Sequence, residues 1–302
     1  MRVLAFAVVL LAVAAPSLAA APSPAACPDS AGSVLYLRGS KEHAVSLATC
    51  RDEPTRAPST GLLPGVRTTG ARAAIQRIWV DDRLVFSHTE NGPVVPRFLS
   101  PDGKWLFFDV DSYASSSVAA DGLDLLVVST HGGPVHHLGL TLTYRDYLTW
   151  CHGRLVYAEG ADRIAIHGKR LLVAAPPTWQ PRVLWRAPGR SFASPACEPG
   201  SDAVAVLSQH SSIDASFFAT RWQLWRVGLN GAHRLLDAPP AGYADEQPTW
   251  SPDGRSLLFV RERKGYGQLM LLRAHTLIGP FADLGYQLGY YGHHDWGLAW
   301  RT

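Results

Sequence analysis

The C-terminal end of the sequence brings together residue types that often do chemistry. His293, His294 and Asp295 are consecutive, and imidazoles with a carboxylate are suitable ligands for zinc, manganese or nickel. Adjacent residues on a strand point to opposite faces, so His293 and His294 would not easily share one ion. We therefore expect no metal and no other cofactor. The weak metal candidates, which would need ligands from different parts of the chain, are His152, His210, His293 and His294.

Several tyrosines stand beside charged residues in short polar segments. A tyrosine offers a large contact area with a polar tip, which suits the binding of a peptide or a sugar. Ordinary solvated loops are the alternative interpretation. No spacing among these residues identifies an acid/base pair, so we predict no catalytic residue. The predicted binding face consists of Tyr144, Arg145, Asp146, Tyr147, Tyr243, Asp245, Glu246, Tyr266, Tyr290, Tyr291, His293, His294 and Asp295.

One short sequence motif occurs twice, and it indicates the fold that positions these residues. The chain reads FLSPDGKWLFFDV from Phe98 and TWSPDGRSLLFV from Thr249. Proline presets the first corner of a type I turn, aspartate suits the second, and glycine takes the left-handed position before an antiparallel return. The apolar runs read as buried strands, which predicts an all-β chain. Turn formation, rather than catalysis, is expected of Ser100, Pro101, Asp102, Gly103, Ser251, Pro252, Asp253 and Gly254.

Weaker copies of the phrase divide the chain into units. Successive equivalent positions are 51, 47, 53 and 50 residues apart, namely Leu99, Trp150, Cys197, Trp250 and Trp300. Four strands per unit and this period indicate the blades of a β-propeller rather than a sandwich. Five full repeats are readable and a partial one begins at Trp79, so we predict six blades. Either the blade at Trp79 is truncated, or residues 76–88 supply outer strands to a neighbour.

The last repeat is incomplete at the C-terminus. Only Arg301 and Thr302 follow Trp300, while the segment from Cys27 to Tyr36 resembles the missing turn and second strand. Joining the two ends rebuilds the repeat. The sequence therefore predicts a ring closed by a C-terminal strand that joins the N-terminal blade, which leaves no free sheet edge.

These residues also carry a family resemblance. The segment from Pro248 to Arg255 and the hairpin from Gly132 to Leu138 resemble the repeat of the TolB family of WD40-like β-propellers (PD40 repeat). That repeat joins a W-S-P-D-G turn to a later D-G-G-x-x-R-R-L hairpin. The resemblance covers the chain from about Cys27 and implies a six-bladed, exported propeller of a kind that often binds proteins. TolB carries an additional N-terminal domain with no room here, so TolB's own function is not expected.

Related repeats occur in two kinds of enzyme. Prolyl oligopeptidase-like peptidases combine such a propeller with an α/β-hydrolase domain and its G-x-S-x-G elbow, which this sequence lacks. Oligogalacturonate lyase has a propeller of the same repeat. This resemblance leaves open an alternative function, that of an extracellular, metal-assisted polysaccharide lyase or hydrolase.

The N-terminus has the pattern of a secretory signal peptide. Arg2 precedes an apolar stretch from Val3 to Ala15, followed by Pro16 and small residues, so we predict a signal peptide over residues 1–20, cleaved near Ala19 or Ala20. The apolar run is too short for a membrane-spanning helix. A single propeller domain over residues 27–302 follows. The predicted location is secreted or periplasmic, at the cell envelope.

The cysteines fit an exported protein, because export permits disulfides. Three pairings of the four cysteines are open, and no C-x-x-C spacing indicates a metal or redox site. Positions in the repeat favour one bridge between consecutive blades and one within the first blade. The predicted pairs are Cys151 with Cys197 and Cys27 with Cys50.

Composition limits the partners. The 302 residues are 47% hydrophobic with a net charge of +3, and no run of like charges occurs. Such a chain can bury a large core but has no basic patch for nucleic acid or for a membrane surface. We predict a monomeric, non-catalytic binding or scaffold module whose ligand is a protein, a peptide or a glycan.

Overall fold

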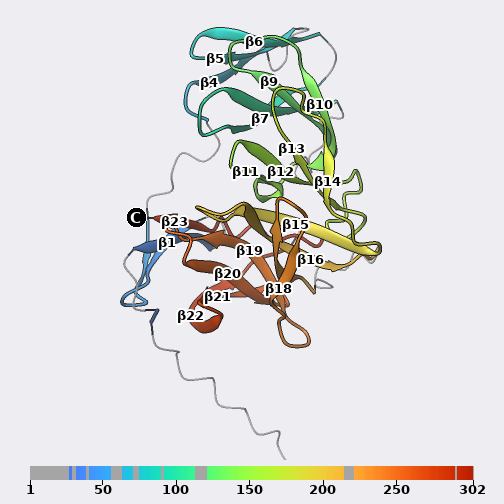
Figure 1. The fold of residues 1–302 in the computed structure, drawn as a ribbon. Coiled ribbons are helices and arrows are strands. Elements are labelled where there is room, and N and C mark those ends of the chain that lie inside the picture. Colours follow the sequence, from blue (N-terminus) through green and yellow to red (C-terminus); the bar gives the residue numbers. More distant parts are fainter. Residues whose placement is uncertain are drawn as a thin grey trace, which may run out of the picture.

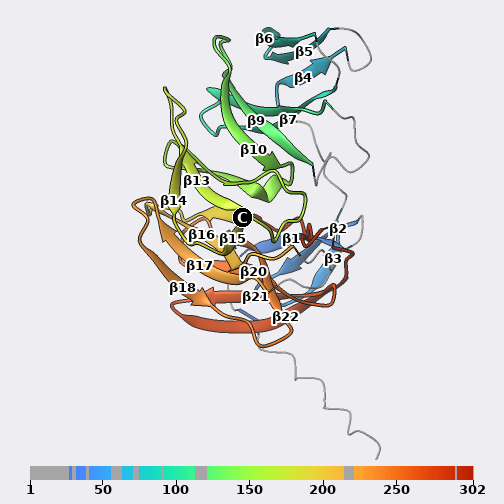
Figure 2. The ribbon, with the colours of Figure 1, turned by 90° about the vertical axis from the view of Figure 1, so that its right-hand side faces the viewer.

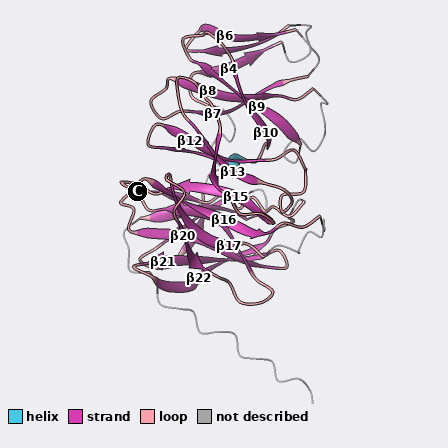
Figure 3. Cartoon of the chain, turned by 45° about the vertical axis from the view of Figure 1, so that its right-hand side comes forward, coloured by secondary structure: helices cyan, strands magenta, loops and turns pink. Residues whose placement is uncertain are grey.

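The structure is a computed structural model that describes residues 27–28, 32–38, 41–55, 63–70, 75–89, 92–112, 121–213, 221–289 and 291–301. The predicted signal peptide and Tyr290 lie outside the described residues. The described chain is almost entirely strand and loop, and its one helical element is the short 3-10 helix η2 (Arg145–Tyr147) (Figure 3). The predicted all-β fold is confirmed.

Within the described residues, the strands form six sheets, five with four antiparallel strands and one with three. The three-stranded sheet contains β4 (Val66–Thr69), β5 (Gln76–Val80) and β6 (Arg83–His88). The next two sheets contain β7 (Val94–Leu99), β8 (Trp105–Val110), β9 (Gly122–Ser129) and β10 (His136–Leu142), then β11 (Leu148–Cys151), β12 (Arg154–Glu159), β13 (Arg170–Ala174) and β14 (Arg182–Trp185). Two more contain β15 (Arg190–Cys197), β16 (Ala203–His210), β17 (Gln223–Gly228) and β18 (His233–Asp237), then β19 (Ala244–Trp250), β20 (Ser256–Arg263), β21 (Tyr266–Arg273) and β22 (Thr276–Tyr286).

The sixth sheet is shared by the two ends of the chain. β23 (Ala299–Arg301) pairs antiparallel with β1 (Ser33–Arg38), which continues into β2 (Lys41–Ser46) and β3 (Asp52–Pro54). Val34 lies opposite Trp300 in this pairing. The Trp300 indole also donates a 3.0 Å hydrogen bond to the Thr249 carbonyl in β19. The shared blade predicted from the sequence is confirmed, and the six sheets are those of a six-bladed β-propeller.

Packing between neighbouring sheets forms the core. Five hydrophobic clusters each join one sheet to the next in chain order, from the β4–β6 sheet round to the shared blade. Figures 1 and 2 show the sheets following one another in that order. Among the described residues, no such cluster joins the β4–β6 sheet to the shared blade. Five seams between blades are therefore packed in the described chain.

The partial repeat at Trp79 is a sheet of its own. β5 and β6 form the predicted pair of strands around Trp79, and β4 adds a third strand on the other side of β5. Trp79 donates a 3.2 Å hydrogen bond from its indole to Thr69 Oγ1, and the Arg67 guanidinium lies 4.5 Å from its ring centroid. Of the two interpretations, a truncated blade is therefore the one observed.

The repeated phrase builds the same turn in both copies. Ser100 Oγ donates to Asp102 Oδ1 at 2.6 Å, and that carboxylate accepts the Lys104 N–H at 3.2 Å. Ser251, Asp253 and Arg255 repeat these contacts at 2.6 and 3.0 Å. The hydrogen bond from serine lowers the pKa of both aspartates. These residues serve the turn, which supports their predicted scaffold role.

Both predicted disulfides are present. Cys151 in β11 is bonded to Cys197 in β15, which links the inner strands of two consecutive blades. Cys27 is bonded to Cys50, which ties the N-terminal segment to the loop after β2. The described chain contains no free cysteine.

Candidate binding face and buried histidine network

Strand register divides each blade into two ends. In the β19–β22 sheet, Trp250 lies opposite Leu257 at the end that carries the Ser-Pro-Asp-Gly turn, and Ala244 lies opposite Glu262 at the other end. Tyr266 and Tyr286 also pair at that other end. The segment of η2 directly precedes β11, the first strand of its sheet, so it lies at the corresponding end of its own blade. We call this end of the blades the loop face, and most of the predicted binding residues lie on it.

Asp146 of η2 and His293 form a buried pair across the fold. His293 Nε2 lies 2.9 and 3.0 Å from the two carboxylate oxygens of Asp146, which also accepts a hydrogen bond from the Ser194 hydroxyl. Burial alone would lower the pKa of His293, but the Asp146 charge and hydrogen bond outweigh it and raise the pKa. Burial would raise the pKa of Asp146, and the charge and hydrogen bond of His293 outweigh that and lower it. The contact therefore favours the charged form of each group.

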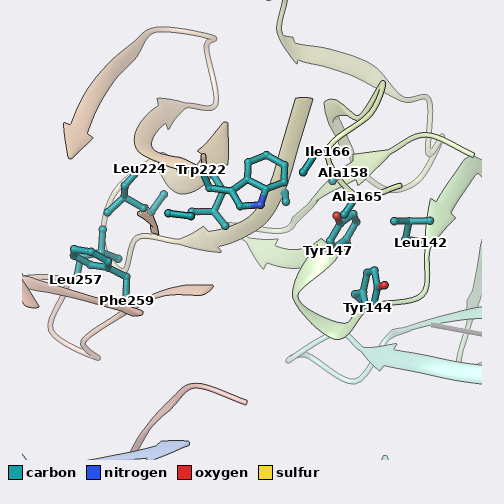
Figure 4. Packing of buried hydrophobic residues seen from close by; sticks show 14 of the residues in the cluster. Leu142, Tyr144, Tyr147, Ala158, Ala165, Ile166, Trp222, Leu224, Leu257 and Phe259 are labelled. Atoms are coloured by element: carbon teal, nitrogen blue, oxygen red, sulfur yellow. The ribbon is translucent and has the colours of Figure 1, made fainter. Parts of the chain in front are cut away.

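Aromatic rings enclose this pair. The His293 ring stacks on Tyr144 with 3.9 Å between centroids and 10° between planes, and its edge meets Tyr147. Both tyrosines belong to the hydrophobic cluster that continues to Trp222, Leu257 and Phe259 (Figure 4). Burial raises the pKa of Tyr147 well above its ordinary value. The two tyrosines therefore serve the core around His293 and offer little contact area to a ligand.

His294 takes a second carboxylate partner. Its Nδ1 lies 2.9 Å from Glu246 Oε1, and Glu246 Oε2 accepts a 2.7 Å hydrogen bond from the Trp296 indole. Glu262 lies close to the same histidine and accepts the backbone N–H of Gly265. His294, Glu246 and Glu262 are all almost fully buried. Burial alone would lower the pKa of His294, but the Glu246 charge and hydrogen bond raise it overall.

The opposite orientation expected for adjacent histidines is observed. His293 faces the blade of β11–β14 and His294 faces β19, so the two residues pin the segment before β23 to two different blades. Gln247 adds a third contact, because its Oε1 accepts the Trp296 N–H at 2.9 Å while its Nε2 donates to Asp295 at 3.2 Å. We call these residues the histidine network, which consists of Asp146, Glu246, Gln247, Glu262, His293, His294 and Trp296.

The remaining predicted residues divide between core and surface. Asp245 is fully buried, where its carboxylate accepts a 2.9 Å hydrogen bond from Arg261, and burial raises its pKa well above the ordinary value. Tyr291 lies under the Arg163 guanidinium at 4.9 Å, and its carbonyl accepts the Ala165 N–H. Arg145 and Asp295 are exposed.

An exposed tyrosine patch lies on the loop face beside the histidine network. Tyr266 and Tyr286 are 59% and 46% exposed with 5.3 Å between ring centroids, and Leu288 next to them is 64% exposed. The Arg263 guanidinium packs on the Tyr243 ring at 5.2 Å in the same sheet. We call Tyr243, Arg263, Tyr266, Tyr286 and Leu288 the tyrosine patch.

Backbone contacts join the patch to the network. Gly265, one residue before Tyr266, donates its N–H to Glu262 and accepts the Gln287 N–H at 2.8 Å. The Gln287 side chain donates to the carbonyl of Asp295. The network therefore fixes the loops that present the tyrosine patch.

Two groups of side chains have the residue types and spacing of a metal site. Among the described residues, two groups of three potential ligands have their atoms within 4.8 Å of one another. The group at Cys151, His152 and Cys197 contains a disulfide, so its sulfurs are not thiolate ligands. Glu246, Glu262 and His294 form the other group, whose oxygens and nitrogen suit a divalent ion. His210 is exposed at the end of β16 and His152 at the turn after β11, so the four candidate histidines do not converge.

The predicted binding face leaves out Gln247, which follows Glu246 directly in the sequence, and three further residues of this region. Glu262 lies within a charged stretch that reads as a solvated turn, Trp296 lies outside the repeat frame, and Ser194 lies in a β15 segment with a register shift. Each acquires its role from a partner in another blade. Only knowledge of which distant positions contact one another in the fold could have identified them.

Comparison with known proteins finds similar solved structures. No family model and no curated protein matches the sequence. TolB from Acinetobacter baumannii is 13% identical, with 89% of this chain and 66% of that chain covered at a TM-score of 0.49. A puromycin hydrolase is 15% identical over 84% of this chain and 43% of that chain, with a TM-score of 0.46. Oligogalacturonate lyase from Vibrio parahaemolyticus is 12% identical over 82% and 71%, with a TM-score of 0.40.

The described residues include no helix that is both long and apolar enough to cross a membrane.

Proposed function

We propose that this chain is an exported β-propeller that binds a protein or peptide ligand through the tyrosine patch. The exposure of Tyr266, Tyr286 and Leu288 at one corner of the loop face carries the proposal. Tyrosine and arginine side chains are enriched among the residues that dominate binding energy at protein interfaces. The patch offers rings, an aliphatic side chain and the Arg263 guanidinium together.

The buried residues beneath the tyrosine patch also support the proposal. The patch is presented by the turn between β20 and β21, which is bonded to Glu262 of the histidine network, and by the end of β22. After β22, Gln287 donates to the carbonyl of Asp295, which lies between His294 and Trp296 in the chain. A surface whose backbone is already ordered loses less entropy on binding. The titratable groups of that network are buried and bonded to one another, which suits a structural role better than proton transfer to a substrate.

Matched variants test the binding proposal. The double variant Tyr266→Ala with Tyr286→Ala removes the patch, while Leu277→Ala changes a 39% exposed side chain at the opposite end of the same strand pair. We expect tagged wild type and Leu277→Ala to capture one common protein from envelope extracts, and the double variant to lose it. Equal capture by all three chains would contradict the assignment of the patch.

Export has its own test. Expression of the full chain with a C-terminal tag, followed by fractionation and N-terminal sequencing, should give a mature protein that begins near residue 20. An uncleaved chain in the cytoplasm would contradict export without bearing on the patch.

A second candidate function rests on Glu246, Glu262 and His294, whose ligand atoms lie within 4.8 Å. This group favours a metal-assisted lyase or hydrolase, in which a divalent ion would polarise a carboxylate or activate a water. Elemental analysis of purified protein decides between the two functions. A stoichiometric metal that is lost in Glu262→Gln would support the enzyme, and metal-free protein that still captures its partner would support the binding module.

A further inference from the structure

A pocket of about 380 Å³ lies at the seam between the blade of β11–β14 and the blade of β15–β18. Its volume is within the range of small-molecule sites, roughly 300–1,000 Å³. It is distant from the tyrosine patch in sequence and belongs to other blades. The lining residues that matter here are Lys169, Arg170, Trp185, Arg186, Arg190 and Phe192. Four of these are basic, and the described residues that line the pocket include no acidic one.

Arg190 is the central charge of this pocket. Its guanidinium donates to Ser208 Oγ at 2.8 Å, to the Ser208 carbonyl at 3.0 Å and to Gln223 Oε1 at 3.1 Å, all of which are neutral acceptors. It also lies 5.2 Å from the Trp225 ring. Within the described chain, no carboxylate pairs with it. Burial lowers the pKa of Arg190, as expected for a guanidinium without a counter-ion.

Two further cationic residues, Lys169 and Arg186, line the same pocket. Lys169 is fully buried, and its ammonium donates to the backbone carbonyls of Asp162, Ile164 and His167, the last at 3.0 Å. Burial lowers the pKa of Lys169 to about 8. Arg186 is exposed at the rim and forms no ion pair within the described residues.

The carboxylates nearby are already engaged. Glu159 forms a two-point pair with Arg170 at 2.7 and 2.9 Å, and Asp162 bonds His167 at 2.6 Å. The positive charges of Arg186 and Arg190 are therefore left for an anion from outside, whereas the three N–H groups of the Lys169 ammonium already donate to backbone carbonyls. Buried or half-buried cations gain most from such a partner because water screens them least.

Aromatic walls complete the site. Trp185 stacks on His233 at 4.2 Å and contacts Phe192 at 5.0 Å, which holds the indole in place at the base of the pocket. Pro188 and Ala187 add apolar surface. A flat apolar ring fits such walls, and a planar carboxylate matches the fork of a guanidinium.

We propose that this pocket binds a small organic acid with one ring, its carboxylate bonded to Arg190 and Arg186 and its ring against Trp185. The ligand is a monoanion of single-ring size, distinct from the protein or peptide that the tyrosine patch binds. Occupancy would add contacts across the seam between two blades, so the acid also stabilises the folded chain.

Titration calorimetry with benzoate as the probe tests this site on the full mature chain. We expect saturable benzoate binding that weakens with added salt, and benzamide, which keeps the ring but lacks the charge, to bind about tenfold more weakly. Inorganic phosphate should bind more weakly than benzoate because it lacks the ring. Absence of benzoate binding, or equal binding of benzoate and benzamide, would overturn the proposal. Phosphate binding as tight as that of benzoate would overturn the role of the ring.

Substitutions of Arg186 and Arg190 test the proposed contacts with the benzoate carboxylate. Arg186→Gln should weaken benzoate binding about tenfold, the loss expected for a charge-assisted hydrogen bond. Arg83→Gln, exposed on β6 in another sheet, is the matched control and should bind as wild type does. Arg190→Lys should also weaken binding while keeping the charge near Ser208. If Arg190→Lys fails to fold, the test rests on Arg186→Gln alone. Wild-type affinity of Arg186→Gln for benzoate would overturn the proposed site.

Discussion

His293 Nε2 lies within 3.0 Å of both carboxylate oxygens of Asp146, although 147 positions separate the two residues in the chain. The pair joins the segment before the closing strand β23 to the blade of β11–β14. We expect a double-mutant cycle of His293→Gln and Asp146→Asn to give a coupling free energy of about 1–3 kcal/mol in urea unfolding. Additive losses in the cycle would show that the pair does not stabilise the fold.

The same pair predicts a pH dependence. The folded pKa of His293 is raised, so its stabilising contribution is fully present below the unfolded pKa of about 6.5 and is lost as the pH rises through the folded value. The pKa of Asp146 is lowered, so its contribution is lost as the pH falls through its folded value. Wild type should therefore exceed His293→Gln in unfolding free energy most near pH 6.

Urea midpoints of both chains between pH 5 and 9 check this expectation. His294 is present in both chains and titrates in the same direction, so the difference between wild type and variant isolates His293. The difference should shrink towards pH 9. A difference that stays constant over this range would contradict the charged pair.

The repeated turns offer a comparison within one molecule. Gly103 and Gly254 have nearly the same left-handed φ, +69° and +71°, but a Cβ at 254 would lie 2.7 Å from the Pro199 carbonyl oxygen, whereas one at 103 meets nothing within 4 Å. Gly103→Ala should cost about 1 kcal/mol for its backbone conformation. Gly254→Ala should cost about 1–3 kcal/mol more because it crowds the neighbouring blade. Thermal or urea unfolding of both variants measures the difference, and equal losses would show that the contact with Pro199 is relieved without cost.

Most of the fold could be predicted from local sequence patterns. The type I turn at Ser251–Gly254 uses contacts within five residues, and the apolar runs after each turn form the expected strands. The pairing of β23 with β1 was predictable because Trp300 keeps its place in the repeat. β4 escaped prediction because Val66–Thr69 has only four residues and a single buried apolar side chain, although the Pro64-Gly65 turn stands directly before it.

The candidate site was predictable only in part. Segments such as Tyr144–Tyr147 and His293–Asp295 stood out by residue type, yet the sequence placed them at a surface. In the fold, Tyr144 and His293 are buried because their rings stack on each other and because the Asp146 carboxylate bonds His293 Nε2. Tyr266 has the same residue type and lies exposed, since its strand ends at the rim of the blade. Burial depends on contacts between blades, which a local pattern does not contain.

Site-specific photo-crosslinking in cells tests the binding function most directly. A benzophenone amino acid is placed at position 266 in the tyrosine patch or at position 277, which lies at the other end of the same strand pair. The proposed function predicts a discrete crosslinked partner from position 266 and none from position 277. Crosslinks of equal yield from both positions, or none from position 266, would contradict a binding function for the tyrosine patch.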